Sequence, residues 1–170
     1  MRAFIAVDIP KKIKKEVVKI QNSLPEFKGK KTEQENLHLT LKFLGEVNQE
    51  ALEKVKNKLK SIKFEQFETE IDSIGTFNAR IVWLHMAGCE ELQRKIDGSL
   101  KGLFLSEKRF MSHLTIARVK EIKDKKSFLK ELGKIKFDKI GFEVKEFKLK
   151  ISTLTRKGPA YEDLEVYNLK

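Results

Sequence analysis

The sequence predicts an α+β fold of two similar lobes, each an antiparallel sheet with outer helices, arranged around a central groove. The chain has 170 residues and only three histidines, and two of these open nearly identical tetrads, His38-Leu39-Thr40-Leu41 and His113-Leu114-Thr115-Ile116. The tetrads lie 75 residues apart, and the same offset carries Phe67-Glu68 onto Phe142-Glu143. Each tetrad is followed by a pattern of strand, helix, strand and strand, so the two halves of the chain share one plan.

Each tetrad predicts a half-buried strand. Side chains alternate between the faces of a strand, so His38 and Thr40 share one face while the neighbouring leucines point into a core. The same alternation holds for His113 and Thr115. Two such strands related by an approximate two-fold axis would bring both His-x-Thr pairs to one groove. The alternative is two ordinary strands with one exposed histidine each, and the repetition of the motif in a basic chain argues against it.

The other elements follow from hydrophobic spacing, capping residues and turn signals. In the first half we expect a strand over 2–9, a helix from Pro10 to about Ser23, and a polar loop over the groove at 24–36 with room for one short strand. The first tetrad strand then runs to about Gly45, and a helix follows from Asn48 to about Ile62. A hairpin of strands at 64–77 and 80–86, which turns at Asn78-Ala79, completes this half. In the second half we expect a helix beginning near Cys89, a loop at 102–109, the second tetrad strand, a helix over 123–132, and strands at 136–149, 150–156 and 164–169.

Length and composition indicate a soluble globular protein. Hydrophobic residues make up 40% and charged residues 36% of the chain, and 170 residues suffice for a single domain over 1–170 with a sizeable core. No stretch approaches 18 apolar residues, and the N-terminus runs directly into a strand pattern, so we expect neither a membrane span nor a signal peptide. The single cysteine, Cys89, allows no internal disulfide and favours a reducing cytoplasm, where a buried, inert thiol is expected.

The net charge of +11 favours a polyanionic partner, and RNA is the natural one. A second explanation competes with this one. The cations comprise 30 lysines and only six arginines, and lysine-rich surfaces are also typical of proteins adapted to heat. Heat adaptation accounts for many lysines but not for the excess of positive over negative charge.

Four segments carry a resemblance to a known family. The stretches from Asn36 to Gly45 and from His113 to Arg118 resemble the paired signatures of the two-histidine (2H) phosphoesterase superfamily. The opening Arg2–Pro10 and the closing Gly158–Glu162 are similar to its RNA 2′,3′-cyclic phosphodiesterase branch, historically called 2′-5′ RNA ligases. One departure is Ser112, which stands where many members have proline. The resemblance spans nearly the whole chain and implies the 2H phosphoesterase fold.

The resemblance implies an enzyme that hydrolyses RNA 2′,3′-cyclic phosphate ends to 2′-phosphates. It implies His38 as the proton donor and His113 as the proton acceptor, although the symmetry of the two motifs leaves the order open. Histidine titrates near pH 6.5 and can serve either role, and the hydroxyls of Thr40 and Thr115 can donate to the phosphorane oxygens. The expected protein is a cytoplasmic monomer that needs no cofactor and acts on RNA with cyclic phosphate ends, tRNA fragments included.

The candidates for substrate binding carry weaker signals. Arg118 lies at an odd offset from His113, which on a regular strand points it to the opposite face, so contact with phosphate requires a strand end or a bulge, and a surface ion pair is the alternative. For Phe43, stacking on a base and packing in the core are balanced readings. Four further side chains are weaker candidates, more in keeping with structural roles: Arg80, Trp83, Arg156 and Tyr161. His85 has no threonine partner and is expected simply to occupy a strand.

The absence of certain motifs argues against a metal site and against a reaction driven by ATP. There is no H-E-x-x-H and no paired-cysteine spacing, so no metal site is predicted, and no P-loop, so ATP-driven ligation is disfavoured. Two alternatives stay open. One is ATP-independent 2′-5′ ligation of tRNA halves by the reverse reaction, and the other is a catalytically silent module that binds RNA or nucleotides.

Overall fold

The computed structural model describes all residues from 1 to 170. Its nine strands are β1 (Arg2–Asp8), β2 (Lys28–Lys31), β3 (His38–Glu46), β4 (Phe67–Phe77), β5 (Ile81–Ala87), β6 (His113–Glu121), β7 (Ile140–Val144), β8 (Glu146–Thr155) and β9 (Gly158–Asn168). Its helices are α1 (Lys11–Asn22), the 3-10 helix η1 (Gln34–Asn36), α2 (Gln49–Lys60), α3 (Glu90–Ser99) and α4 (Lys125–Gly133).

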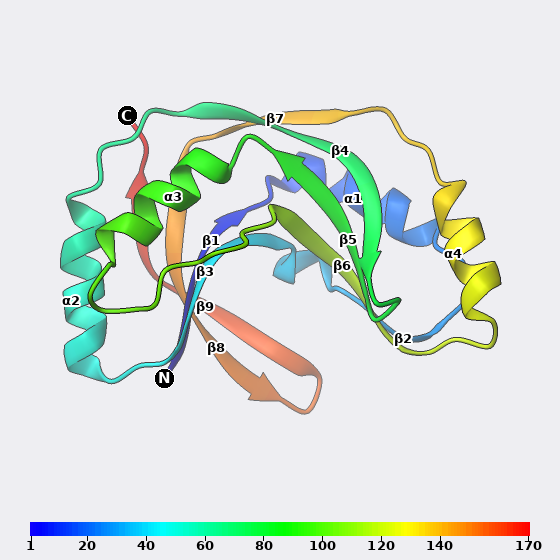
Figure 1. Ribbon diagram of the computed structural model, residues 1–170, viewed down its shortest axis with the longest axis horizontal. Coiled ribbons are helices and arrows are strands. Elements are labelled where there is room, and N and C mark those ends of the chain that lie inside the picture. The colour runs from blue at the N-terminus through cyan, green and yellow to red at the C-terminus, as the bar shows by residue number, and fades with distance from the viewer.

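All strands belong to one curled sheet with the order β7-β4-β5-β6-β3-β1-β8-β9, and β2 pairs with β6 at the side. The two tetrad strands meet at its centre, where Leu39 is paired with Leu114. One lobe lies on each side of this junction, with α2 and α3 over one lobe and α1 and α4 over the other (Figure 1). The lobes therefore share a continuous sheet, in place of the two separate sheets that the repeat suggested.

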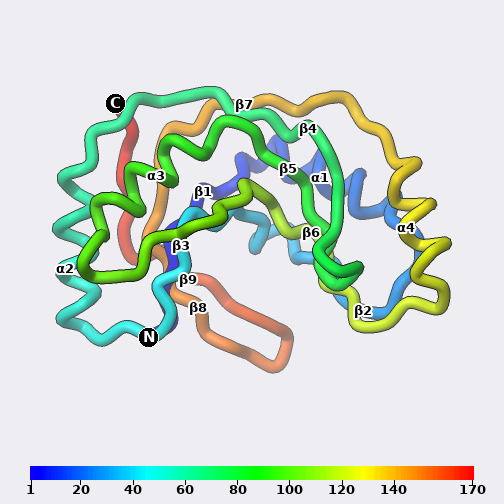
Figure 2. Tube along the Cα trace, in the orientation of Figure 1, coloured from blue at the N-terminus to red at the C-terminus, as the bar shows by residue number.

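The lobes exchange elements along the chain. Helix α1 follows β1 but packs on β6 in the other lobe, and α3 follows β5 but packs on β3. The Gln21 side chain of α1 fixes the first of these contacts, because its amide donates to the carbonyls of Thr32 and Ile116 at 2.9 Å each. The tube in Figure 2 shows the chain passing back and forth between the lobes. Neither half of the sequence is thus a lobe by itself.

Several local expectations are confirmed. The Asn48 side chain caps α2 by accepting from the Ala51 amide at 2.8 Å. Asn78 and Ala79 take positive φ angles of 52° and 53° in the turn between β4 and β5. Cys89 is buried, and burial raises the pKa of its thiol, in keeping with an inert side chain.

The expected boundaries at the C-terminal end are wrong. Residues 134–139 are not strand, β7 ends at Val144 instead of continuing to 149, and β9 begins at Gly158 instead of Leu164. The reason is tertiary. Val144 is paired with Phe67 in one lobe, whereas β8 pairs with β1 in the other, so the chain must leave one lobe and enter the other at Lys145.

The tetrad strands anchor the core. The apolar residues between and beside the histidines and threonines are at most 1% exposed, namely Leu37, Leu39, Leu41, Leu114 and Ile116. Burial follows the same pattern, position for position, along β3 and β6. No helix combines the length and the apolar composition that crossing a membrane requires. The core thus fixes both strands with their His-x-Thr faces turned away from it.

Candidate active site

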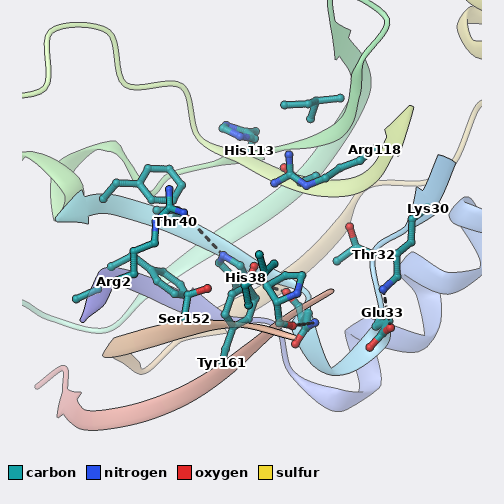
Figure 3. Close-up of a pocket in the computed structure, with 18 of the residues that line it drawn as sticks. Arg2, Lys30, Thr32, Glu33, His38, Thr40, His113, Arg118, Ser152 and Tyr161 are labelled. Carbon is teal, nitrogen blue, oxygen red and sulfur yellow. Dashed lines mark hydrogen bonds and ion pairs between the residues drawn. The ribbon is translucent and has the colours of Figure 1, made fainter. Parts of the chain in front are cut away.

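Both His-x-Thr faces open into one cavity of about 620 Å³ between the lobes (Figure 3). The cavity wall includes His38 and Thr40 from β3 and His113 and Thr115 from β6. The pairing of Leu39 with Leu114 makes the two histidines diagonal neighbours across the strand junction. Diagonal residues on paired strands lie roughly 7–8 Å apart, a spacing at which both rings can contact one phosphoryl group.

A β-bulge lies directly after the threonine in each tetrad strand. In β6, Trp83 is paired with Thr115 and Val82 with Ala117, so Ile116 is an extra residue. In β3, Ala6 is paired with Thr40 and Ile5 with Lys42, so Leu41 is the equivalent extra residue. A bulge reverses the alternation that follows it.

The bulges explain how two candidates reach the cavity. Phe43 and Arg118, which are equivalent in the repeat, both return to the face that carries the histidines and line the cavity. Phe43 is 75% exposed, so it is not a core residue. The odd offset of Arg118 is thereby accounted for. The repeat places an aromatic ring on one wall and a guanidinium on the other.

Backbone carbonyls fix the tautomer of both histidines. The Asn36 carbonyl lies 2.7 Å from His38 Nδ1, and the Met111 carbonyl lies 2.8 Å from His113 Nδ1. Because a carbonyl only accepts hydrogen bonds, each Nδ1 must carry a proton. Each Nε2 is therefore the nitrogen that can accept a proton from, or donate one to, a substrate. His38 Nε2 lies 3.0 Å from the Thr40 hydroxyl, which can donate to it (Figure 3).

Aromatic side chains hold the rings in place. The His38 ring lies 5.1 Å from the rings of both Phe4 and Tyr161, and the His113 ring lies 5.1 Å from that of Phe77. Burial lowers the pKa of His38, and Lys150 and Arg118 lower it further, against the opposing effects of the Asn36 carbonyl and Asp8. The neutral form of His38 is therefore favoured before any anion binds.

The cavity is positively charged. Arg2, Lys31 and Arg118 line it, and none of them has a carboxylate oxygen within 4.0 Å. Lys30 is the exception, because its ammonium pairs with Glu33 at 2.9 Å. Unpaired cations beside two imidazoles and two hydroxyls are the kind of groups that can bind a phosphate.

The chain matches a family described as LigT like Phosphoesterase. The match covers residues 7–83 and 86–161, which are the parts of the chain around the two tetrads. The chain belongs to this LigT-like phosphoesterase family. An RNA 2′,3′-cyclic phosphodiesterase of Methanocaldococcus jannaschii is 42% identical over 171 residues, covering 95% of this chain and 97% of the relative. One of the same description from Archaeoglobus fulgidus is 37% identical over 180 residues, covering 98% and 99%.

The fold agrees with solved structures of the LigT-like family. The crystal structure of Escherichia coli LigT complexed with 3′-AMP aligns with a TM-score of 0.82 at 26% identity, covering 99% of this chain and 98% of that one. The two-lobed α+β architecture expected from the sequence is confirmed.

The remaining candidates of this LigT-like phosphoesterase divide into two groups. Tyr161 lines the cavity, whereas Arg80 and Arg156 do not. Arg80 is the last residue of the turn between β4 and β5 and donates to the Lys120 carbonyl at 2.8 Å, and Arg156 lies exposed in the turn between β8 and β9. Trp83 packs against Phe77 with ring centres 5.4 Å apart.

No three His, Cys, Asp or Glu side chains are grouped in a way that could hold a metal ion.

Sequence reasoning missed several cavity residues, including Arg2, Lys30, Lys31 and Ser152. Two signals were available. Arg2 is one of only six arginines and begins the strand expected over 2–9, and the Lys30-Lys31 pair stands out in the polar segment expected to cover the groove. Ser152 carried no signal, because the sequence does not show that β8 pairs with β1.

Proposed function

We propose that this protein hydrolyses the 2′,3′-cyclic phosphate ends of RNA to 2′-phosphates, with two imidazoles as acid and base and without a metal ion. One observation carries the proposal: two histidines with matched tautomers face a single cationic cavity, each accompanied by a threonine hydroxyl. The relatives described as RNA 2′,3′-cyclic phosphodiesterases support the choice of substrate.

The proposed reaction is an in-line displacement at phosphorus. His113 Nε2 takes a proton from water, the resulting hydroxide attacks the phosphorus, and the bond from phosphorus to O3′ breaks. His38 Nε2 delivers a proton to O3′, so the phosphate remains on O2′ and the 3′-hydroxyl is restored. Thr40, Thr115 and Arg118 stabilise the negative charge that builds up on the non-bridging oxygens.

The donor role of His38 requires it to be protonated when the substrate is bound. Its pKa is lowered in the free protein, mainly by burial. A phosphate anion in the cavity opposes this effect, because a nearby opposite charge favours the imidazolium form. We therefore propose that the substrate brings His38 into its active form by binding beside it.

Other residues that line the cavity are placed to bind the base and the phosphate of the nucleotide. Phe43 offers an exposed ring for a base to stack on, and Arg118 and Tyr161 flank the phosphate position. All of these groups come from a single chain, which supports action as a monomer. Cytoplasmic RNA ends, such as those of tRNA fragments, are the substrates that we propose.

Product analysis tests the proposal. The protein is incubated with 2′,3′-cyclic AMP, and separately with an RNA that ends in a 2′,3′-cyclic phosphate, in buffer containing EDTA, and the products are identified by chromatography and mass spectrometry. The expected product is the 2′-phosphate. Joining of RNA ends with a 5′-hydroxyl oligonucleotide would support the ligase alternative, and binding without turnover would support the silent module. Loss of activity in EDTA, restored by a divalent metal, would contradict the metal-free mechanism.

A further inference from the structure

The hairpin of β8 and β9 continues past the edge of the sheet. Arg2 and Ser152 are the last pair between β1 and β8, whereas β8 and β9 stay paired as far as Thr155 and Gly158. Residues 153–160, which we call the arm, therefore pair only with each other. Figure 1 shows the arm projecting from the body of the molecule as a two-stranded ribbon.

Hydrogen bonds tie the arm to residues 30–36. The Lys30 ammonium donates to the Lys157 carbonyl, and the Asn36 side-chain amide donates to the Pro159 carbonyl at 3.1 Å. Lys30 belongs to β2, which pairs with β6 in the other lobe. A two-stranded hairpin is marginally stable by itself, so these contacts hold the arm in place where a third strand is missing.

One face of the hairpin lines the cavity. Ser152 is paired with Tyr161 and Leu154 with Pro159, and all four residues are in the cavity wall. The Tyr161 ring lies 5.1 Å from that of His38, so the first pair adjoins the imidazole. The second pair is two residues further out, roughly 7 Å along the strand. The cavity thus extends from the histidines onto the arm.

Two exposed apolar side chains in the cavity wall flank one cation. Leu154 is 85% exposed and Phe43 is 75% exposed. In the sheet, β1 separates β3, which carries Phe43, from β8, which carries Leu154. Arg2 lies on β1 at the point where the arm leaves the sheet, as the register partner of Ser152. The wall therefore presents an aromatic ring, a guanidinium and a leucine in succession.

The charge of the wall indicates which partner fits it. Glu33 is the only carboxylate among the residues that line the cavity, and it pairs with Lys30 at 2.9 Å. Arg2 has no carboxylate oxygen within 4.0 Å and is free to bind an anion. An apolar group, a cation and a second apolar group match a base, the linking phosphate and the next base of single-stranded RNA, whose bases can be splayed apart to pack on side chains.

We infer that the arm forms a second nucleotide subsite, in which Leu154 and Pro159 pack on the base of the nucleotide before the terminal one and Arg2 binds the phosphate between the two. The inference rests on the proposed function for the position of the terminal phosphate, between His38 and His113. It deepens that function, because the preferred substrate becomes an RNA end of at least two nucleotides in place of a cyclic mononucleotide. Leu154 is then a specificity residue that does not touch the reacting atoms.

Calorimetric binding of reaction products tests the subsite without turnover. The probes are 2′-AMP and the dinucleotide ApA with a terminal 2′-phosphate, titrated at the same salt concentration. We expect the dinucleotide to bind at least about fivefold more tightly, as one additional stacked base would make it. Leu154→Ala should reduce this ratio of affinities by about threefold to fivefold, because half of the leucine's apolar contact with a base is lost or more.

Leu105→Ala is the matched control, because Leu105 is 93% exposed but lies outside the cavity. Arg2→Gln tests the linking phosphate. It should flatten the dependence of log affinity on log salt concentration by about 0.7 more for the dinucleotide than for 2′-AMP, the value for one lost phosphate contact. Equal changes for the two ligands would contradict the part assigned to Arg2.

The inference is overturned if the dinucleotide binds no more tightly than 2′-AMP. It is equally overturned if Leu154→Ala keeps the wild-type ratio of affinities, or if Leu105→Ala lowers that ratio as far as Leu154→Ala does. A protein that shows the expected ratios but hydrolyses neither 2′,3′-cyclic AMP nor the dinucleotide with a cyclic phosphate end would contradict the proposed function and leave the second subsite standing.

Discussion

At the scale of single residues, the proposed mechanism depends on which nitrogen of each tetrad histidine carries a proton. Carbonyl groups two residues earlier in the chain settle this for both rings in the same way. The threonine two residues later then lies on the same face as the ring. The sequence predicted this arrangement, because both contacts are local to a strand and depend only on side-chain alternation.

The threonine hydroxyls offer the first prediction. Thr40→Val and Thr115→Val should each lower kcat on 2′,3′-cyclic AMP by about 10²-fold, the cost of removing one donor to a developing oxyanion. Thr40→Ser and Thr115→Ser keep the hydroxyl and serve as controls that should retain most of the activity. Equal rates for the valine and serine variants would contradict the donor role.

The half-buried His38 should make stability depend on pH. Its pKa is lowered, so between its folded value and its unfolded value near 6.5 the unfolded chain binds more protons than the folded one. Stability should therefore fall as the pH drops below about 6.5. Urea unfolding at pH 7.5 and 5.5 should show a smaller difference for His38→Gln than for the wild type.

This window separates His38 from the acidic groups. The pKa values of Asp8 and Asp163 are lowered from 3.8, so their contribution is lost only at a lower pH. An unchanged difference between the two pH values in His38→Gln would show that burial of His38 does not have this effect.

At the scale of elements, the sequence indicated which segments are strands and helices but not how the tetrad strands bend. Arg118 and Phe43 reach the cavity only because a bulge follows each tetrad. A bulge depends on pairing with the next strand, which no local pattern shows. The division between β7 and β8 at Lys145 was missed for the same reason, since it reflects two different pairing partners.

A buried ion pair ties the segment before β6 to the opposite lobe. Lys42 of β3 and Asp97 of α3 are 5% and 12% exposed, with Nζ and Oδ1 2.5 Å apart. The Lys42 ammonium also donates to the Leu105 carbonyl, and Asp97 accepts from the Glu107 amide. The pair thus anchors the loop that leads to His113.

Removing one partner of this pair should be costly. We expect Asp97→Ala to lower the free energy of unfolding by about 3–5 kcal/mol, because it leaves a buried ammonium without its counter-charge. The double variant Lys42→Met/Asp97→Leu removes both charges and should recover most of that loss. Chemical denaturation measures both. If the double variant were as unstable as Asp97→Ala, the loss would come from packing and not from the unpaired charge.

At the scale of the whole molecule, the repeat creates the site. Two tetrad strands meet once, at Leu39 and Leu114, and the exchange of α1 and α3 between the lobes locks that junction. The sequence showed that two His-x-Thr pairs exist and that symmetry could bring them together. It did not show the exchange of helices, because intervals along the chain do not reveal which lobe a helix covers.

The net charge of +11 should act through the cavity. The affinity for a single-stranded RNA bearing a 2′-phosphate end should fall with salt, and Arg118→Gln should reduce the slope of log affinity against log salt concentration by about 0.7, the value for one lost phosphate contact. Arg80→Gln is the control, because Arg80 lies outside the cavity. Fluorescence anisotropy gives both slopes, and an equal change in the two variants would place the phosphate elsewhere.

The most direct test of the central claim is the turnover of 2′,3′-cyclic AMP by His38→Ala and His113→Ala, with folding checked by circular dichroism. General acid–base catalysis contributes about 10²–10⁴-fold, so each folded variant should lose at least about 10²-fold in kcat/KM. Full activity in either folded variant would contradict a mechanism in which two imidazoles act on one phosphorus.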